Sequence, residues 1–449
     1  MTTGKIFPVL LKFALPLMLG SLFQNLYHLA DLSIAGYTLG DHALAAISAT
    51  GALATLINAT AMGFNMGNSI RIAQEFGAGN LKLARKAFAG VIELCIAMAV
   101  IFTALLLALI TPLLKLVQTP DELFQDAKAY IVVIIIGLIA SMMYNMFAGA
   151  FRALGNSLTP LIFLIISSLL NIGLDLLFIA VFGMGVVGAA VATVLSQAIS
   201  AVASGIYLHA NYPEMRLKKE DFRGNGSLIK DMIPMGLSVA LSNSLFAIGD
   251  IAIQGAVNSL GSDIIISHAS ASRIKSFAII PSINMANACS TFAAQNYGAG
   301  KYDRITRGLY SAVIFNVFVN IVTTAIAYLF GGELIALVTN TESAQVIANG
   351  SMMLRIVIPF MWTQTIITGY RMTLQSMGQK VTPVIGTGIE LVCRFVCAFG
   401  LAPVFGFKGI CFAEPASWVT SGALMVICYY VLLRKLKNGR SDRAVFRKP

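Results

Sequence analysis

Long apolar stretches alternate with short polar segments along the whole of this 449-residue chain. Each stretch holds at least about 20 mostly apolar residues, the length that a helix needs to cross a bilayer. Because most polar connections are short, successive helices are expected to run antiparallel. The pattern predicts twelve spanning helices, at residues 9–36, 43–70, 86–114, 129–151, 160–182, 186–208, 230–257, 265–292, 306–331, 347–371, 382–404 and 409–433.

The composition agrees with a membrane protein and excludes a soluble one. Hydrophobic residues make up 57% of the chain and charged residues 11%, whereas soluble domains carry about 25% charged residues. A soluble enzyme of this size could not cover its core with so little polar surface. The six cysteines all fall in apolar stretches, where we interpret them as packing residues. The fold class is therefore predicted to be all-α and integral to the membrane.

The net charge of +11 is explained by topology. Of the 31 Lys and Arg residues, 24 lie in the N-terminus, the even-to-odd connections and the C-terminal tail, and three lie in the opposite connections. Cytoplasmic segments carry the excess of basic residues, so both termini are predicted to be cytoplasmic in a cell membrane. A nucleic-acid partner is not needed to account for the basic tail at residues 434–449, which we expect to lie against the anionic bilayer surface.

The chain is predicted to be an internal duplication. Its longest polar stretch, residues 209–229, separates a half at 1–208 from a half at 230–433. Three motifs recur at offsets of 221 to 223: residues 76–80 as 297–301, 153–160 as 376–383, and 185–196 as 406–417. Each half has an even number of spans, so the repeats enter the membrane in the same sense. Transporters of this kind bind substrate between their halves.

Two glycine-rich copies, FGAGN at 76–80 and YGAGK at 297–301, suggest either a phosphate-binding loop or a helix-ending turn. Neither copy follows a strand, and no Lys-Ser or Lys-Thr pair completes a nucleotide loop. Tight turns that end helices are the favoured interpretation.

Several segments together resemble the multidrug and toxic compound extrusion (MATE) family. They are YHLADLSIAG at 27–36, EFGAGNLKLARKA at 75–87 and the segment at 271–305, and the likeness extends from about residue 8 to about 433. The resemblance implies a cation-coupled antiporter that expels amphipathic, often cationic organic compounds by alternating access. It further implies no enzymatic activity and no cofactor besides the coupling ion, H+ or Na+. We expect a monomer.

Acidic residues within spans mark a candidate coupling site, since a charge in the bilayer costs at least about 2.5–3.5 kcal/mol. Asn171 and Asp175 are four residues apart and share a helix face. With Asp31 and Thr193 they form an oxygen-rich set that suits a small hard cation, and two close carboxylates would also titrate as a pair. The alternative is that these side chains only hold helices together. The family resemblance implies the cation site at these four residues, and a bend of the first helix at Pro16.

The second half does not copy this set. Its equivalents of Asn171, Asp175 and Thr193 are Arg394, Ala398 and Glu414, and it also carries Glu390, four residues before Arg394. Glu390 and Arg394 predict an internal ion pair, which Glu414 could close, and a second proton-sensitive site is the alternative. Asp250 is expected to pair with Arg273 or Lys275, because an unpaired carboxylate would be costly.

Amides on several helices are candidates for a substrate cavity, although bonding between helices is the default for any one of them. His28 lies three residues before Asp31 and titrates in the physiological range, but a packed histidine is the commoner case. Glu93, near a span end, is expected to reach the interface. No metal site is predicted beyond possible Na+ at Asp31 and Asp175. The cavity candidates are Gln24, Asn25, His28, Asn145, Asn284 and Asn287.

Two other functions remain as alternatives. A lipid-linked oligosaccharide flippase of related architecture would line its cavity with several cations, whereas at least two of the four cations within these spans have candidate acidic partners. A membrane enzyme would need a catalytic motif, and the sequence contains neither HExxH nor GxSxG.

Overall fold

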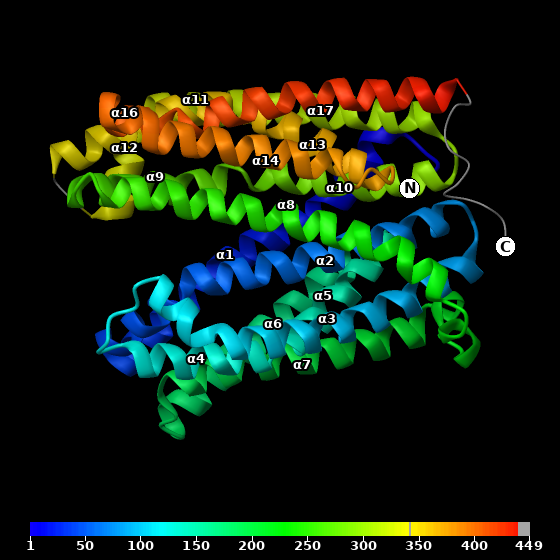
Figure 1. Ribbon diagram of the computed structural model, residues 1–449, viewed down its shortest axis with the longest axis horizontal. Helices are drawn as coiled ribbons and strands as arrows, with labels where there is room; N and C mark the ends of the chain where they lie inside the picture. The colour runs from blue at the N-terminus through cyan, green and yellow to red at the C-terminus, as the bar shows by residue number, and fades with distance from the viewer. Residues whose placement is uncertain (341–342, 439–449) are drawn as a thin grey trace. The chain divides into compact units, whose positions relative to one another are not determined.

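The computed structural model describes residues 1–340 and 343–438, apart from the side chains of residues 28–33 and 35. All regular elements in these ranges are helices (Figure 1). The chain divides into two units: unit 1 comprises residues 1–248 and 294–299, and unit 2 comprises residues 249–293 and 300–449. The boundary passes through two helices, α8 and α10, whose ends belong to different units.

Unit 1 is built around an apolar core between α2, α3, α5 and α7, in which Phe88, Met146 and Phe151 are buried. Its elements are α1 Ile6–Ala49, α2 Gly51–Gly77, α3 Leu81–Leu116, α4 Phe124–Ile136, α5 Leu138–Ala153, α6 Leu158–Asp175, the π-helix η1 Leu176–Val181, α7 Gly185–Asn211, the 3-10 helices η2 Pro213–Met215 and η3 Lys219–Phe222, and α8 Gly226–Asn258 up to residue 248.

Unit 2 has its own core, in which Trp418 of α17 is buried with Phe407 and Met353. Its elements, after the end of α8, are α9 Ser262–Ala278, α10 Ile280–Gly298 up to residue 293, α11 Tyr302–Thr339, α12 Ala344–Val357, η4 Ile358–Phe360, α13 Met361–Ser376, α14 Thr382–Phe395, the π-helix η5 Val396–Leu401, α15 Ala402–Phe405, α16 Phe407–Cys411 and α17 Ala413–Lys437.

The twelve predicted spans agree with the helices. Nine helical segments of the described chain are long and apolar enough to cross a membrane, and three bent helix pairs raise the number to twelve if each pair is one span. The prediction of an all-α, twelve-span membrane fold is confirmed.

The bends themselves were not predicted, and one has a clear steric cause. The fourth span is bent by 46° between α4 and α5, at Gly137. A Cβ atom at this position would overlap the side chain of Val194 on α7. Close packing against α7 therefore requires glycine where the helix breaks. The eighth span is bent by 45° between α9 and α10.

The duplication is visible in the backbone as well as in the sequence. Glycines with positive φ occur in pairs at the repeat spacing, which are Gly40 and Gly261, Gly79 and Gly300, Gly155 and Gly378, and Gly185 and Gly406. Both halves also carry a six-residue π-helix, η1 after α6 and η5 after α14. Positive φ favours glycine because other residues are strained there. The repeated motifs thus encode repeated turns.

The glycine-rich copies end helices, as predicted, and they also contact each other. A Cβ at Gly77 would overlap the backbone of Gln295, and one at Gly298 would overlap the backbone of Gln74. Gln295 and Gly298 are the repeat equivalents of Gln74 and Gly77, and all four lie in unit 1. The first glycine of each copy is therefore needed for a reciprocal close approach of α2 and α10.

The polar stretch between the halves is structured and bound to unit 1. The buried carboxylate of Asp221 accepts a hydrogen bond from Arg85 Nε at 2.6 Å and another from the Lys218 amide at 2.7 Å. Asn156, which lies between α5 and α6, donates a hydrogen bond to Tyr212 Oη at 2.7 Å. Most of the predicted basic tail, residues 439–449, lies outside the described residues.

Candidate functional site

Two of the predicted coupling residues are buried on one face at the end of α6. Asp175 and Asn171 are each 1% exposed. Asp175 is the last residue of α6, and the π-helix η1 begins directly after it. Such π-helical turns are frequent at functional sites. A buried carboxylate at a helix irregularity is placed as an ion site would require.

Tyr27 of α1 holds this face of α6. Its hydroxyl donates a hydrogen bond to Asn171 Oδ1, while Asn171 Nδ2 is buried without a hydrogen-bond partner among the described residues. The packing of α1 against α6 also includes Gly20 of α1, where a Cβ would lie 3.5 Å from Leu161 Cδ1 of α6. Gly20 lies near Leu161 and Tyr27 lies near Asn171, so residue numbers increase in the same direction along the two helices. Therefore α1 and α6 run in the same direction.

This register determines where position 31 falls. Residue 31 follows Tyr27 by four residues on α1, as Asp175 follows Asn171 on α6. Four residues advance a helix by about 6 Å, so positions 31 and 175 lie at about the same level. The side chains of Asp31 and His28 lie outside the described residues.

The other two residues of the predicted set are less directly placed. Thr193 lies on α7, which packs against α6, and its hydroxyl donates to the carbonyl of Ala189 in its own helix at 3.1 Å. Pro16 lies within α1, while the backbone of α1 leaves helical geometry at Gly40, with φ 79° and ψ 179°. The structure thus gathers Asn171, Asp175 and Tyr27.

The cavity candidates fall in different units. Gln24 and Asn25 of α1 and Asn145 of α5 belong to unit 1, whereas Asn284 and Asn287 of α10 belong to unit 2. Gln24 is exposed, Asn25, Asn145 and Asn287 are half-buried, and Asn284 is buried. The amides of Asn145 and Asn284 donate to the carbonyls of Ser141 and Ile280, four residues earlier, each at 2.9 Å.

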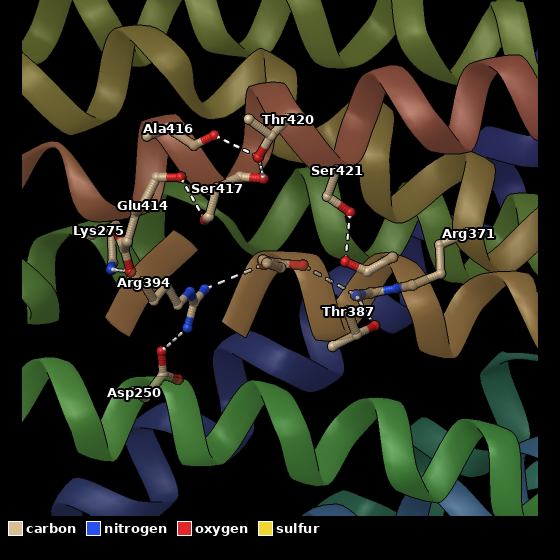
Figure 2. A network of polar contacts seen from close by, with 12 residues as sticks. Asp250, Lys275, Arg371, Thr387, Arg394, Glu414, Ala416, Ser417, Thr420 and Ser421 are labelled. Carbon is tan, nitrogen blue, oxygen red and sulfur yellow. Dashed lines mark hydrogen bonds and ion pairs between the residues drawn. The ribbon is translucent and has the colours of Figure 1, made fainter. Parts of the chain in front are cut away.

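Unit 2 contains a chain of ion pairs where unit 1 has its carboxylate and amide (Figure 2). Arg394 of α14 is 1% exposed, and it donates to Asp250 Oδ1 at 2.6 Å and to Glu390 Oε1 at 3.4 Å. The other oxygen of Glu390 lies 3.6 Å from Nη1 of Arg371 on α13. Arg371 also donates to Thr387 Oγ1 at 3.3 Å. The predicted ion pair of Glu390 and Arg394 is present, within a longer network.

Glu414 of α17 lies at the end of this network and forms an ion pair with Lys275. Its Oε1 atom accepts a hydrogen bond from Lys275 Nζ at 2.5 Å, which joins α17 to α9. Figure 2 shows this pair next to Arg394, at one end of the network. Lys275, Arg371 and Arg394 therefore each have a carboxylate partner.

The expectation that Asp250 pairs with Arg273 or Lys275 is wrong, because its partner is Arg394. The physical reason is a glycine on α8. A Cβ at Gly249 would lie 2.9 Å from Arg394 Cδ and 3.1 Å from Nη1, so glycine leaves room for this side chain beside α8. The Asp250 side chain remains 54% exposed, whereas Glu390 is 3% exposed.

Tyr27 was not among the site residues predicted from the sequence, and Arg371 was given no role. Tyr27 stands four residues before Asp31, a spacing that could have suggested a shared face. Arg371 was assigned to the end of a span, but α13 continues to Ser376. No group of three or more His, Cys, Asp or Glu residues in the described part of the chain could hold a metal ion.

Comparisons with known proteins agree with this architecture. A family profile described as MatE matches residues 16–177 and again 238–399, so it matches each half once. The chain is 29% identical over 306 residues to the probable multidrug resistance protein YpnP of Bacillus subtilis, covering 68% of each chain. It is 23% identical to YoeA of the same organism, a probable multidrug resistance protein, covering 95% of this chain and 94% of the relative.

A solved structure described as MATE in the bent conformation superposes with a TM-score of 0.90 at 23% identity, covering 97% of both chains. This likeness supports the fold. The two profile matches cover well over half of the chain, and their offset of 222 residues equals the repeat spacing. Family members are membrane transporters and not enzymes, and the chain belongs to the MATE family.

Proposed function

We propose that the protein is a secondary active multidrug exporter. In this proposal H+ or Na+ enters a site formed by Asp31, Asn171, Asp175 and Thr193, and a small, amphipathic, often cationic organic compound leaves by alternating access. The observation that carries the proposal is the buried pair Asn171 and Asp175, held against α1 by Tyr27. The descriptions of YpnP and YoeA as probable multidrug resistance proteins support the substrate class.

The physical basis is the cost of a buried carboxylate. Asp175 is placed in a spanning helix and is almost fully buried. Its negative charge is costly there unless a proton or a metal cation neutralises it. A site that loads a cation changes the local charge and can therefore favour one conformation of the transporter.

The ion pairs of unit 2 support a structural role for that half. Lys275, Arg371 and Arg394 each have a carboxylate partner, so these cations are not displayed for a pyrophosphate as in the flippase alternative. In the proposal, unit 1 carries the exchangeable ion, and the network of Glu390, Arg394 and Glu414 fixes helices within unit 2.

Reconstituted vesicles test this function. Purified protein is placed in liposomes with a fluorescent cationic dye, and either a pH gradient or a sodium gradient is applied. Dye movement driven by one of the two gradients supports the proposal and identifies the ion. Absence of movement under both gradients, or movement that is independent of either, would contradict coupled export.

The coupling residues are tested in the same assay. Asp31→Asn and Asp175→Asn remove an ionisable group at nearly constant volume, and each should abolish gradient-driven dye movement. Glu93→Gln is the matched control, since Glu93 is a half-buried carboxylate on α3 that is not part of the predicted coupling set. Its rate should stay within about twofold of the unmodified protein. Equal loss in all three variants would indicate general destabilisation and not a site.

A further inference from the structure

Helix α11 presents an apolar stripe that is exposed in the described part of the chain. It is the least buried of the nine candidate spans, with 17% of its most apolar 18-residue window buried. Ile314, Phe318 and Ile321 are exposed at helical spacing along it. Toward the beginning of the helix the same stripe continues through Tyr310 to Arg307, and both are exposed. Exposed apolar side chains on a spanning helix contact the acyl chains of lipids. At the beginning of α11 this stripe ends at a cation, Arg307.

Helix α17 carries a similar exposed apolar stripe that ends in an arginine. Ile427 and Val431 are exposed, and the exposed Arg434 follows on the same face. Arg434, like Arg307, therefore stands at the polar end of an apolar stripe. Neither guanidinium has an ion pair within 4.0 Å in the described part of the chain.

Three contacts join these two helix ends side by side (Figure 1). Asp303 pairs with Lys437 at 2.7 Å, the hydroxyls of Thr306 and Tyr429 are 2.9 Å apart, and the hydroxyls of Tyr310 and Tyr430 are hydrogen-bonded. Residue numbers rise along α11 as they fall along α17, so the helices are antiparallel. Arg307 and Arg434 consequently lie at one level, between the tyrosine pair and the ion pair.

The order of groups along the two helices matches the layers of a bilayer edge. The apolar stripes end at Tyr310 and Tyr430, and tyrosines are enriched where acyl chains meet headgroups. About one turn beyond them stand Arg307 and Arg434, with Lys437 further out and Asp303 as the nearby carboxylate. Three cations thus face one carboxylate. Guanidinium groups bind phosphate oxygens through two parallel hydrogen bonds.

We propose that Arg307 and Arg434 form a binding site for the phosphate of an anionic phospholipid, whose acyl chains lie along the exposed stripes of α11 and α17. The phosphate lies at the level of the two arginines, and the hydroxyls of Tyr310 and Tyr430 lie beneath it at the ester region. This site is independent of the coupling site in unit 1, and it makes no use of the exporter activity.

Native mass spectrometry tests the site. Purified protein is titrated with phosphatidylglycerol or with phosphatidylcholine, and the retained lipid is counted. The unmodified protein should retain phosphatidylglycerol in preference to phosphatidylcholine. Arg307→Gln combined with Arg434→Gln should weaken retention of phosphatidylglycerol about thirtyfold, since each cation near an anionic lipid contributes about 1 kcal/mol. Both side chains are exposed, so folding should be unaffected, and thermal unfolding followed by intrinsic fluorescence checks this.

The matched control removes two other exposed cations at helix ends, Lys5→Gln and Lys82→Gln, which lie on unit 1. Its retention of phosphatidylglycerol should equal that of the unmodified protein. The proposal is overturned if the arginine variant retains the lipid normally, or if the lysine control loses as much. It is equally overturned if soluble glycerol 3-phosphate competes as well as the lipid, because the site would then recognise free phosphate without a membrane.

Discussion

Buried polar residues are arranged differently in the two halves of the chain. In unit 1, Asp175 and Asn171 lie together on α6, and the contact from Tyr27 comes from a neutral hydroxyl. In unit 2, the equivalent region holds Arg394, paired with two carboxylates. In the proposal, Asp175 takes up an exchangeable cation, whereas the fixed guanidinium of Arg394 supplies the positive charge beside Glu390.

The role of the Tyr27 hydroxyl can be measured at the level of one atom. Tyr27→Phe removes the donor to Asn171 Oδ1 and leaves the ring in place. A lost hydrogen bond of this kind costs about 0.5–1.5 kcal/mol, so gradient-driven dye transport should fall several-fold but not vanish. Tyr37→Phe is the control, because Tyr37 is 94% exposed on the same helix. Unchanged transport in Tyr27→Phe would exclude a positioning role.

The ion network of unit 2 should matter more for stability than for coupling. Arg394→Met leaves the Glu390 carboxylate buried with Arg371 at 3.6 Å as its nearest charged partner. Breaking a buried pair by removing one partner typically costs about 3–5 kcal/mol, which lowers the thermal midpoint by several degrees. Arg273→Gln, which removes an exposed arginine, is expected to change the midpoint little. A midpoint for Arg394→Met equal to that of Arg273→Gln would contradict the assignment.

The individual helices were predicted better than their interruptions. Twelve apolar stretches were visible because the length of a span is a local property of the sequence. The bend at Gly137 depends on Val194, which is distant in sequence, and the partner of Asp250 depends on Gly249 and a helix 144 residues later. These features arise from packing between helices, and hydrophobic patterns alone do not specify it. The spacing of Tyr27 from Asp31 indicates a shared helix face, but the contact of Tyr27 with Asn171 depends on the packing of α1 against α6.

The reciprocal glycine contact of α2 and α10 predicts strong sensitivity to one methyl group. In Gly298→Ala the new Cβ would overlap the carbonyl of Gln74, so the two helix ends must separate. Backbone shifts of this kind cost about 1–3 kcal/mol. Gly255→Ala is the matched control, since a Cβ there meets nothing within 4 Å. Thermal unfolding of the two variants checks the prediction, and equal midpoints would show that the contact is not tight.

The polar stretch between the two halves, residues 209–229, is expected to be held to the rest of unit 1 by Asp221. Burial raises the pKa of this carboxyl, but the hydrogen bonds from Arg85 and from the Lys218 amide outweigh burial and lower the pKa below its ordinary value. A lowered folded-state pKa contributes stability above the unfolded-state pKa, and this contribution is lost as the pH falls through the folded-state value. Trypsin should therefore cleave Asp221→Asn faster than the unmodified protein after Lys218, Lys219 and Arg223 at neutral pH.

The exposed neighbour Glu220 provides the control for this segment, and Glu220→Gln should be cleaved at the unmodified rate. The difference in thermal midpoint between the unmodified protein and Asp221→Asn should be present at pH 7 and should shrink in acid as Asp221 is protonated. A difference that is constant down to pH 3 would show that the ionised carboxylate is not what holds the segment.

Over the whole molecule, duplication explains the fold and divergence explains the division of roles. Paired glycines, paired π-helices and two matches to one family profile show that both halves descend from one six-helix plan. The duplication is recognisable in the sequence because the turn glycines occur at equivalent positions in both halves. The sequence also revealed that Asp175 has no carboxylate equivalent, since Ala398 stands at its repeat position. In the proposed function, cation exchange therefore belongs to unit 1 alone.

Cation release on substrate binding tests this assignment most directly. Purified protein is mixed with a cationic dye in weakly buffered solution, and released protons are followed with a pH indicator, or displaced Na+ with a sodium-selective electrode. The account predicts that the unmodified protein and a Glu390→Gln variant release the cation when dye binds, whereas Asp175→Asn binds dye without release. Undiminished release by Asp175→Asn, or loss of release only in Glu390→Gln, would contradict it.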